Sequence, residues 1–168
     1  MGSTLCSAST EPLHLGRDRA ALGARVSTFS DLLGVELGPS SWLDVSQERI
    51  ERFAEATEDS QWIHVDADRA AQGPFRTTIA HGFLTLSLCV PMLYEVLPRS
   101  GGMVVNYGVN RVRFPAAVPS GGRVRGRFRV LSVEDVSSGE RATIEASVEC
   151  DHVEKSVCVA ELVLLTVS

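Results

Sequence analysis

DSQWIHVDADRAAQGPFRTTIAHGFLTLSL, residues 59–88, combines two candidate reactive residues with the start of a long apolar run. It opens with a carboxylate and an imidazole five residues apart, Asp59 and His64. On a continuous helix, five residues correspond to a turn of about 500°, so the two side chains would diverge by roughly 140°. They converge only if the segment between them is a bent loop. Two interpretations stay open at this point: a reactive pair, or a capping Asp59 with a His64 packed at an interface.

The second half of the stretch leads into a long apolar helix, expected from residue 82 to residue 97. Apolar side chains cover nearly every side of this helix, and a helix of that kind must be surrounded, here by a sheet that wraps it. Pro91 lies inside the run and removes one backbone hydrogen bond. We therefore expect a kink or an early helix end near Val90.

Long strands are predicted after the helix, because Val, Arg, Thr and Ile dominate segments that are separated by turn residues. In the second segment, Arg123, Arg125, Arg127 and Arg129 alternate with inward-facing residues, which gives one arginine-rich face. A strand from the first half, 42–45, should complete the sheet. The predicted fold class is α+β, with the strands antiparallel. The four long segments are Met103–Phe114, Arg123–Val136, Arg141–His152 and Ser156–Val167.

An amphipathic helix is expected before the central stretch. Ser46 is a suitable N-cap, and the apolar face of the helix repeats at helical spacing from Ile50 to Thr57. Asp59 should therefore lie just past the carboxyl end of this helix. Asp66 can cap a second short helix, 66–72. We expect an N-terminal extension over residues 1–27 and one domain over residues 28–168.

Composition narrows the function classes. The chain has 168 residues, 44% of them hydrophobic, and a formal net charge of −5. That charge argues against nucleic acid or an anionic membrane surface as the main partner. The four cysteines show no metal-ligand spacing, and we expect buried reduced thiols and no metal site. Neither a secretory signal nor a membrane span is recognised, so we expect a cytoplasmic protein.

The start of the apolar helix offers a second chemical group. Gly82 at a helix start has an unpaired N–H at the positive end of the helix dipole, and it has no side chain to obstruct a ligand. Such a donor suits an oxyanion, for example the enolate oxygen of a thioester. His81, the preceding residue, is a candidate ligand contact, with capping or packing as its alternative.

DSQWIHVD followed by GPFRTTIAHGFLTLSL resembles the MaoC-like, R-specific enoyl-CoA hydratase family, within a subgroup of nodulation-protein-N-like hydratases. The resemblance continues through NYGVNRVRFPAAVPSGGRVR, residues 106–125. It implies a hotdog fold, in which a curved antiparallel sheet wraps a central helix, and a homodimer. It also implies hydration of a trans-2-enoyl-CoA to the (R)-3-hydroxyacyl thioester, or the reverse dehydration, with coenzyme A as part of the substrate and no separate cofactor.

The resemblance assigns roles residue by residue. Asp59 and His64 would be the catalytic pair, and the Gly82 N–H would be the oxyanion donor. The residues expected near the substrate are Gln61, Trp62, Arg76, His81, Phe83 and Tyr107. The chain departs from the family pattern twice, because Glu58 and Arg76 stand where glycine is usual. Two interpretations stay open for each residue: Glu58 raises the pKa of Asp59 by like-charge repulsion or points to solvent, and Arg76 contacts a CoA phosphate or only restricts its loop.

Other functions compete with the hydratase. A dehydratase that acts on carrier-protein-bound acyl chains would need an arginine patch for its acidic partner, and the arginine-rich strand face could supply one, although a merely solvated face is the preferred interpretation. A non-catalytic acyl-thioester binder would have a broken catalytic pair. A hotdog thioesterase would need a carboxylate on the central helix, where Glu95 lies too far along to serve.

Overall fold

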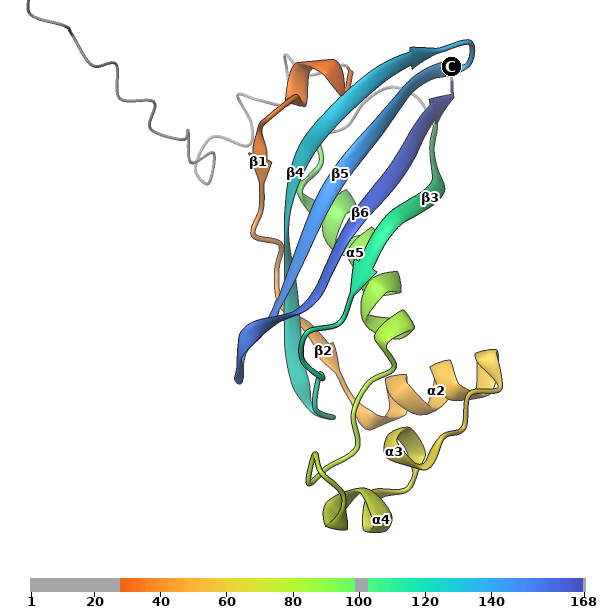
Figure 1. The fold of residues 1–168 in the computed structure, drawn as a ribbon, viewed down its shortest axis with the longest axis vertical. Coiled ribbons are helices and arrows are strands. Elements are labelled where there is room, and N and C mark those ends of the chain that lie inside the picture. Colours follow the sequence, from red (N-terminus) through yellow and green to blue (C-terminus); the bar gives the residue numbers. More distant parts are fainter. Residues whose placement is uncertain (1–27, 99–102, 168) are drawn as a thin grey trace, which may run out of the picture.

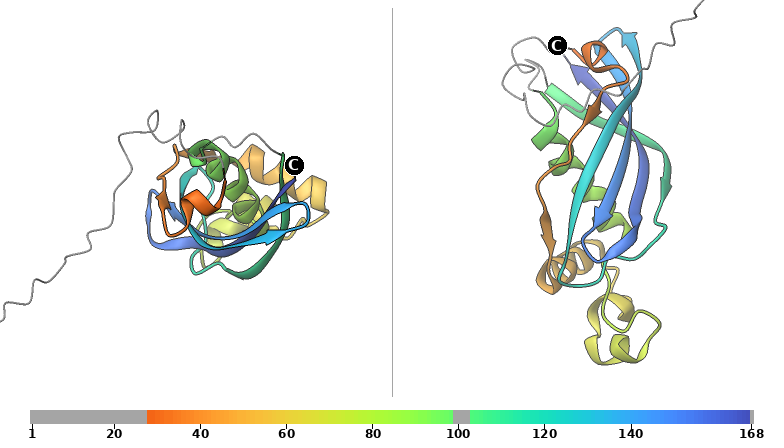
Figure 2. Two further views of the ribbon diagram at one scale, coloured as in Figure 1. Left: turned by 90° about the horizontal axis from the view of Figure 1, so that it is seen from above. Right: turned by 90° about the vertical axis from the view of Figure 1, so that its left-hand side faces the viewer.

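The computed structural model describes residues 28–98 and 103–167. In this part of the chain, six strands form one antiparallel sheet in the order β1-β4-β5-β6-β3, with β2 pairing to β4 as well. The sheet curves around helix α5, and three shorter helices gather at one end of it (Figures 1 and 2). This arrangement is the predicted hotdog fold. The expected extension over residues 1–27 lies outside the described residues.

The long strands agree with the prediction to within three residues at each end. The strand bounds are β1 Glu36–Leu37, β2 Leu43–Val45, β3 Met103–Arg113, β4 Gly122–Val136, β5 Gly139–Cys150 and β6 Val153–Val167. β1 was not expected, because two residues are too short to show a period of two. β3 occupies an edge of the sheet, and its register to β6 shifts at Tyr107 and again between Val109 and Val112. Such bulges are typical of sheet edges.

Helix α5, Gly82–Val96, packs its buried residues against the concave side of the sheet. The helix continues through Pro91, so the expected early end near Val90 is wrong, whereas a kink stays a prediction. The reason is local. Proline at 91 deprives the carbonyl of Ser87 of its partner, and both residues lie on the exposed side of α5, where water can hydrate that carbonyl.

The exposed side of α5 also corrects the expectation of a helix enclosed all round. Phe83, Ser87, Pro91 and Tyr94 follow one another at helical spacing and are all exposed in the single chain. Phe83 is 69% exposed, although it is apolar. The sheet therefore covers one side of α5 and leaves an apolar stripe on the other.

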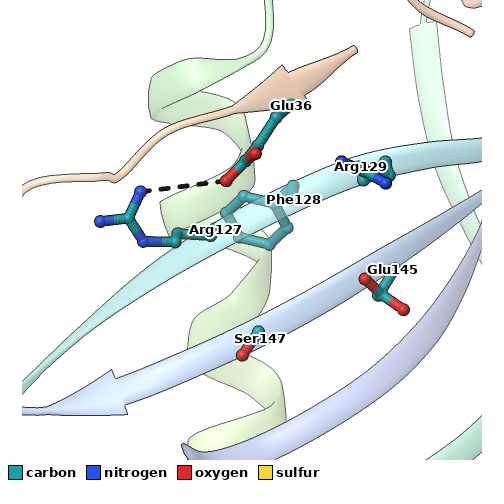
Figure 3. Close-up of a pocket in the computed structure, with 6 residues that line it drawn as sticks. All are labelled: Glu36, Arg127, Phe128, Arg129, Glu145 and Ser147. Atoms are coloured by element: carbon teal, nitrogen blue, oxygen red, sulfur yellow. Dashed lines mark ion pairs between the residues drawn. The ribbon is translucent and has the colours of Figure 1, made fainter. Parts of the chain in front are cut away.

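The arginine-rich face of β4 lies on the outside of the sheet, and carboxylates from neighbouring strands accompany it. Arg123 pairs with Asp151, and Arg127 lies near both Glu149 and Glu36. Figure 3 shows this mixture in a hollow of about 300 Å³ beside β1, lined by Glu36, Arg127, Phe128, Arg129, Glu145 and Ser147. The face is therefore charge-balanced, which favours the interpretation as an ordinary solvated face.

Two further expectations concern the interior and the membrane. Cys89, Cys150 and Cys158 are free thiols and buried, as predicted, while Cys6 lies outside the described residues. Among the helices of residues 28–98 and 103–167, none has both the length and the apolar character needed to span a bilayer.

Candidate active site

Helix α2, Gln47–Thr57, carries the chain to Asp59. The Ser46 side chain accepts a hydrogen bond from the Arg49 N–H at 3.2 Å, so the predicted N-cap is confirmed. The helix ends at Glu58, whose left-handed backbone (φ 59°) turns the chain away from the helix axis. The Glu58 side chain is exposed, and Asp59 follows with its carboxylate 55% exposed.

The chain turns just before Asp59, at the left-handed Glu58, and again before His64, at Gln61. At Gln61, the irregular residues 59–61 give way to helix α3, Trp62–Val65. The expectation of a loop throughout is therefore wrong in part, since His64 itself belongs to a helical turn. That turn points the His64 side chain inward, where it is only 6% exposed.

Hydrogen bonds to the backbone fix the orientation of His64. Its Nδ1 lies 2.7 Å from the Ile79 carbonyl oxygen, and because a carbonyl can only accept, Nδ1 carries the proton. The Ile79 N–H in turn donates to the Ile63 carbonyl at 3.0 Å. In the neutral imidazole, Nε2 is therefore the nitrogen with a free lone pair, which can accept a proton.

Gln47 holds the same region from the opposite side. Its amide donates to the His64 carbonyl at 2.9 Å, and its amide oxygen accepts from the hydroxyl of buried Thr78 at 2.6 Å. Gln47 was not among the predicted site residues, because a polar residue in the first turn of a helix looks like a solvated one. Its role follows from the way α2 packs beside α3.

The ring of His81 packs against the ring of His64. The two rings stack with centroids 3.7 Å apart and planes 23° apart, and Phe53 contacts the His81 ring at 5.0 Å. His81 precedes α5 but its side chain makes no capping hydrogen bond. Its Nε2 instead donates to the backbone carbonyl of Asp59 at 2.9 Å, and it lies 4.0 Å from the Asp59 carboxylate.

The surroundings of His64 lower its pKa below the usual 6.5. Burial is the largest cause, since it disfavours the charged imidazolium, and the nearby His81 acts in the same direction. The hydrogen bond to the Ile79 carbonyl and the Asp59 carboxylate oppose this shift but do not cancel it. At neutral pH His64 is therefore uncharged and able to act as a base.

Gly82, the first residue of α5, borders the same space. A helix leaves its first N–H groups without intrahelical partners, so the start of α5 presents donors at the positive end of its dipole. The ring of Phe114 packs directly on this glycine: a β-carbon at residue 82 would lie 2.7 Å from the ring. The glycine is required by this close packing, as well as by any ligand that approaches the backbone.

A cavity of about 470 Å³ connects His64 to Gly82, and this volume is in the range of small-molecule sites. Apart from His64 and Thr85, its walls are apolar side chains and backbone, so it suits an apolar chain that ends at a polar group. The residues around it are Ile63, His64, Phe75, Ile79, Ala80, Gly82, Thr85, Phe114, Pro115, Ala116, Ala117 and Val157.

The other residues that were expected near the substrate lie around or away from this cavity. Phe83 is exposed at its rim, where it contacts Phe114 edge to face at 6.2 Å. Trp62 packs on Gly73 and lies under the Arg69 guanidinium at 4.5 Å. Gln61, Arg76 and Tyr107 are exposed, and Tyr107 lies on β3. Their roles toward a substrate stay predictions.

The cavity walls include residues that the sequence analysis missed, above all Phe75 and Phe114. Each is a large apolar residue in a loop: Phe75 precedes Arg76, and Phe114 lies within the resembling segment 106–125. A phenylalanine directly after β3 and followed by small residues, FPAA at 114–117, was the available signal. Its meaning depends on how β3 passes the start of α5, which no local pattern reveals.

Asp59, His64 and His81 are also the described residues that could approach a cation together. Each offers one ligand atom, and these atoms lie within 4.8 Å of one another. However, His64 Nδ1 and His81 Nε2 are already hydrogen-bonded to carbonyls, and the two rings stack face to face instead of converging on one point. The expectation that no metal is needed therefore stays a prediction.

Comparison with known proteins places the chain among related sequences. Residues 28–153 match the model of the MaoC like domain family. The chain is 45% identical over 141 residues to 3-hydroxyacyl-thioester dehydratase Z of Mycobacterium tuberculosis, covering 83% of this chain and 93% of the relative. It is 54% identical over 103 residues to nodulation protein N of Rhizobium leguminosarum, covering 60% and 63%.

Among solved structures, R-hydratase PhaJ1 from Pseudomonas aeruginosa superimposes with a TM-score of 0.68. The superposition covers 84% of this chain and 86% of that one, and the sequences are 24% identical, so it shows the fold. The family match spans the chain from β1 to β5, including α5, His64 and Gly82, and the named relatives fit the predicted resemblance and the predicted hydro-lyase class. The chain belongs to the MaoC-like domain family.

Proposed function

We propose that this protein adds water to the double bond of a trans-2-enoyl thioester, with coenzyme A as the carrier, and gives the (R)-3-hydroxyacyl thioester, or catalyses the reverse dehydration. The observation that carries the proposal is the single cavity that has the neutral His64 and the amino end of α5 on its walls. The chain is also closely related to a protein named as a 3-hydroxyacyl-thioester dehydratase.

The proposed chemistry divides the work among three groups. Water attacks C3 of the enoyl chain, and negative charge develops on the thioester oxygen. The Gly82 N–H and the dipole of α5 would stabilise that oxygen. His64 and Asp59 would hold the water, accept one of its protons and return a proton to C2, as general acid–base catalysis requires. Protons balance in this scheme, and no redox step is involved.

The apolar walls support an acyl thioester over a polar substrate. Phe75, Phe114 and Val157 offer contact surface to a hydrocarbon chain, and His64 and the Gly82 backbone supply polar groups. Burial of such a chain contributes about 0.8 kcal/mol per methylene. The expected substrate is therefore apolar at one end and a conjugated thioester at the other.

Incubation with crotonyl-CoA and with longer trans-2-enoyl-CoA thioesters tests the proposal. Loss of the conjugated-enoyl absorbance without release of free thiol, and an (R) product by chiral chromatography, are the expected results. Release of free thiol would indicate a thioesterase. Unchanged absorbance with every chain length would contradict the proposal and favour a non-catalytic acyl-thioester binder.

An acyl-carrier protein as donor of the substrate is the second candidate. It needs a positively charged docking face, and the arginines of β4 are mostly accompanied by carboxylates. Coenzyme A is therefore preferred as the carrier. A comparison of kcat/KM for one acyl chain on both carriers separates the two, and a higher value on the carrier protein would reverse the preference.

We also propose that the protein acts as a homodimer. The exposed stripe of α5 adjoins β3, since the Tyr94 hydroxyl donates to the Val104 carbonyl at 3.3 Å. β3 adds exposed apolar side chains at Met103, Val105, Tyr107 and Val109, and a large exposed apolar surface of this kind is typical of an interface. Light scattering should give twice the chain mass, and Val105→Glu should shift it to the monomer. A monomeric wild type would contradict this.

A further inference from the structure

We propose that His81 is a positioning residue, which holds the backbone of Asp59 and the ring of His64 in their working arrangement without contacting the substrate. This inference rests on the proposed function, because it concerns how the reactive pair of that site is aligned. His81 was expected as a ligand contact, but it is only 2% exposed and is not among the residues that line the cavity.

Two contacts connect His81 to the pair. Its Nε2–H donates to the Asp59 carbonyl at 2.9 Å, which anchors the irregular residues 59–61 to the start of α5. Its ring stacks on the His64 ring at 3.7 Å, while the hydrogen bond from His64 Nδ1 to Ile79 fixes that ring in its plane. One side chain therefore restrains the two residues that approach from different segments.

The other nitrogen of His81 shows that this arrangement has a cost. Because Nε2 is the donor, Nδ1 of the neutral ring carries a lone pair, and this atom is buried without a hydrogen-bond partner among the described residues. A buried polar atom left unsatisfied destabilises a fold, and such atoms in native structures call for an explanation. A phenylalanine would fill the same space without that nitrogen. The histidine is explained by the bond that its Nε2 makes to the site.

The His81 that stacks on His64 also affects the pKa of His64. Burial is the largest cause of the lowered pKa of His64, the nearby His81 lowers it further, and Asp59 opposes the shift. The titratable neighbours of His64 are His81, before α5, and Asp59, after α2. From α2, Glu51 accepts from the Gln47 amide, and Asp66, the N-cap of helix α4 (Ala67–Gln72), accepts from the Arg69 N–H.

Two variants separate the two contacts. His81→Gln can keep a donor toward Asp59 but removes the ring, and His81→Phe keeps a ring against His64 but removes the donor. We expect each to lower kcat by about tenfold or more, on the scale of small misplacements of reactive groups, and to leave KM within about twofold. In both, the acid limb of the pH profile should move to higher pH.

Stability distinguishes positioning from a merely structural role. His81→Phe removes the unsatisfied Nδ1, so its midpoint of urea unfolding should equal or exceed that of the wild type while its activity falls. A structural role predicts the opposite, namely lower stability and an unmoved pH profile. Activity within twofold of wild type in both variants, with an unmoved acid limb, would overturn the inference.

A nuclear magnetic resonance titration of the His64 ring makes the inference independent of turnover. The His64 pKa should be lower in the wild type than in His81→Gln or His81→Phe. If the wild type hydrates no enoyl thioester but the pKa difference is found, the proposed function fails while the role of His81 holds. If the wild type is active and the His64 titration is the same in all three proteins, only the inference fails.

Discussion

The ring of Phe114 occupies the space next to the backbone of Gly82: a β-carbon built on residue 82 would lie 2.7 Å from the ring atoms Cδ2 and Cε2. The glycine has no positive φ, so close packing and not backbone conformation excludes a side chain there. This contact joins the end of β3 to the start of α5 and forms one wall of the cavity.

Gly82→Ala should therefore be destabilising through overpacking. We expect a loss of about 1–3 kcal/mol in the free energy of unfolding, measured with urea, together with lower activity. Gly82→Ala combined with Phe114→Leu should recover part of the lost stability, because leucine removes the ring atoms that clash. Gly108→Ala is the control, since a β-carbon there meets nothing within 4 Å. Equal effects at residues 82 and 108 would contradict the explanation.

Glu58 and Arg76 are the two non-glycine residues with positive φ among the described residues, at 59° and 61°. A non-glycine residue in this left-handed conformation costs roughly 1–2 kcal/mol. Substitution by glycine removes this cost, but the unfolded chain then has more conformational freedom, which reduces the net gain in stability. Glu58→Gly and Arg76→Gly should each stabilise the fold by about 0.5–1 kcal/mol in urea unfolding. Glu55→Gly, within helix α2, should instead destabilise by about 1 kcal/mol. Destabilisation at all three positions would contradict the assignment of strain.

Glu58 and Arg76 show which features could be predicted from the sequence and which could not. The sequence shows that Glu58 and Arg76 stand where glycine is usual, but only the backbone angles show that both residues have positive φ. The strands and the N-cap at Ser46 were predictable because they depend on local period and capping chemistry. The stacking of His81 on His64 was not, because it depends on the approach of two segments seventeen residues apart in the chain.

Helix α5 shows the same limit on a larger scale. Its apolar residues correctly predicted a helix against a sheet, and their number on every side indicated full enclosure. The single chain instead leaves the stripe from Phe83 to Tyr94 exposed. An apolar sequence pattern indicates that a surface is buried, but it does not distinguish burial by the same chain from burial by a second copy.

The lowered pKa of His64 predicts the acid limb of activity in the hydration direction. His64 must be neutral to accept a proton from water, so kcat/KM should fall only as the pH drops below the usual 6.5 of an imidazole. Removal of burial or of His81 would move this limb upward. An acid limb above pH 6.5 in the wild type would contradict the neutral His64.

The same shift affects stability, with a sign fixed by linkage. The unfolded chain binds a proton at residue 64 at higher pH than the folded one, so stability decreases as the pH falls through 6.5. Between pH 7.5 and 5.5, the wild type should lose more free energy of unfolding than His64→Gln does. An equal loss in the two proteins would show that residue 64 does not titrate in this way.

Asp151, in the turn between β5 and β6, gives a pH dependence of the same sign at lower pH. Its carboxylate accepts from the Arg123 N–H at 3.0 Å and from the Arg123 side chain at 2.9 Å, and these bonds lower its pKa to about 2. The stabilisation is present above the unfolded value near 3.8 and is lost as the pH falls through about 2. Asp151→Asn should lower the melting temperature at pH 7, by an amount that shrinks toward pH 2. Asp135→Asn, an exposed control, should show little effect at either pH.

The pairing of Asp59 with His64 is the central claim, and steady-state hydration of a trans-2-enoyl-CoA by matched variants tests it most directly. Asp59→Asn and His64→Ala should each lower kcat by roughly 10²-fold or more, because each removes a group that handles the proton of water. Glu58→Gln removes the neighbouring exposed carboxylate and should stay within about twofold of wild type. Near-normal turnover in Asp59→Asn or His64→Ala, with both proteins folded, would contradict the account.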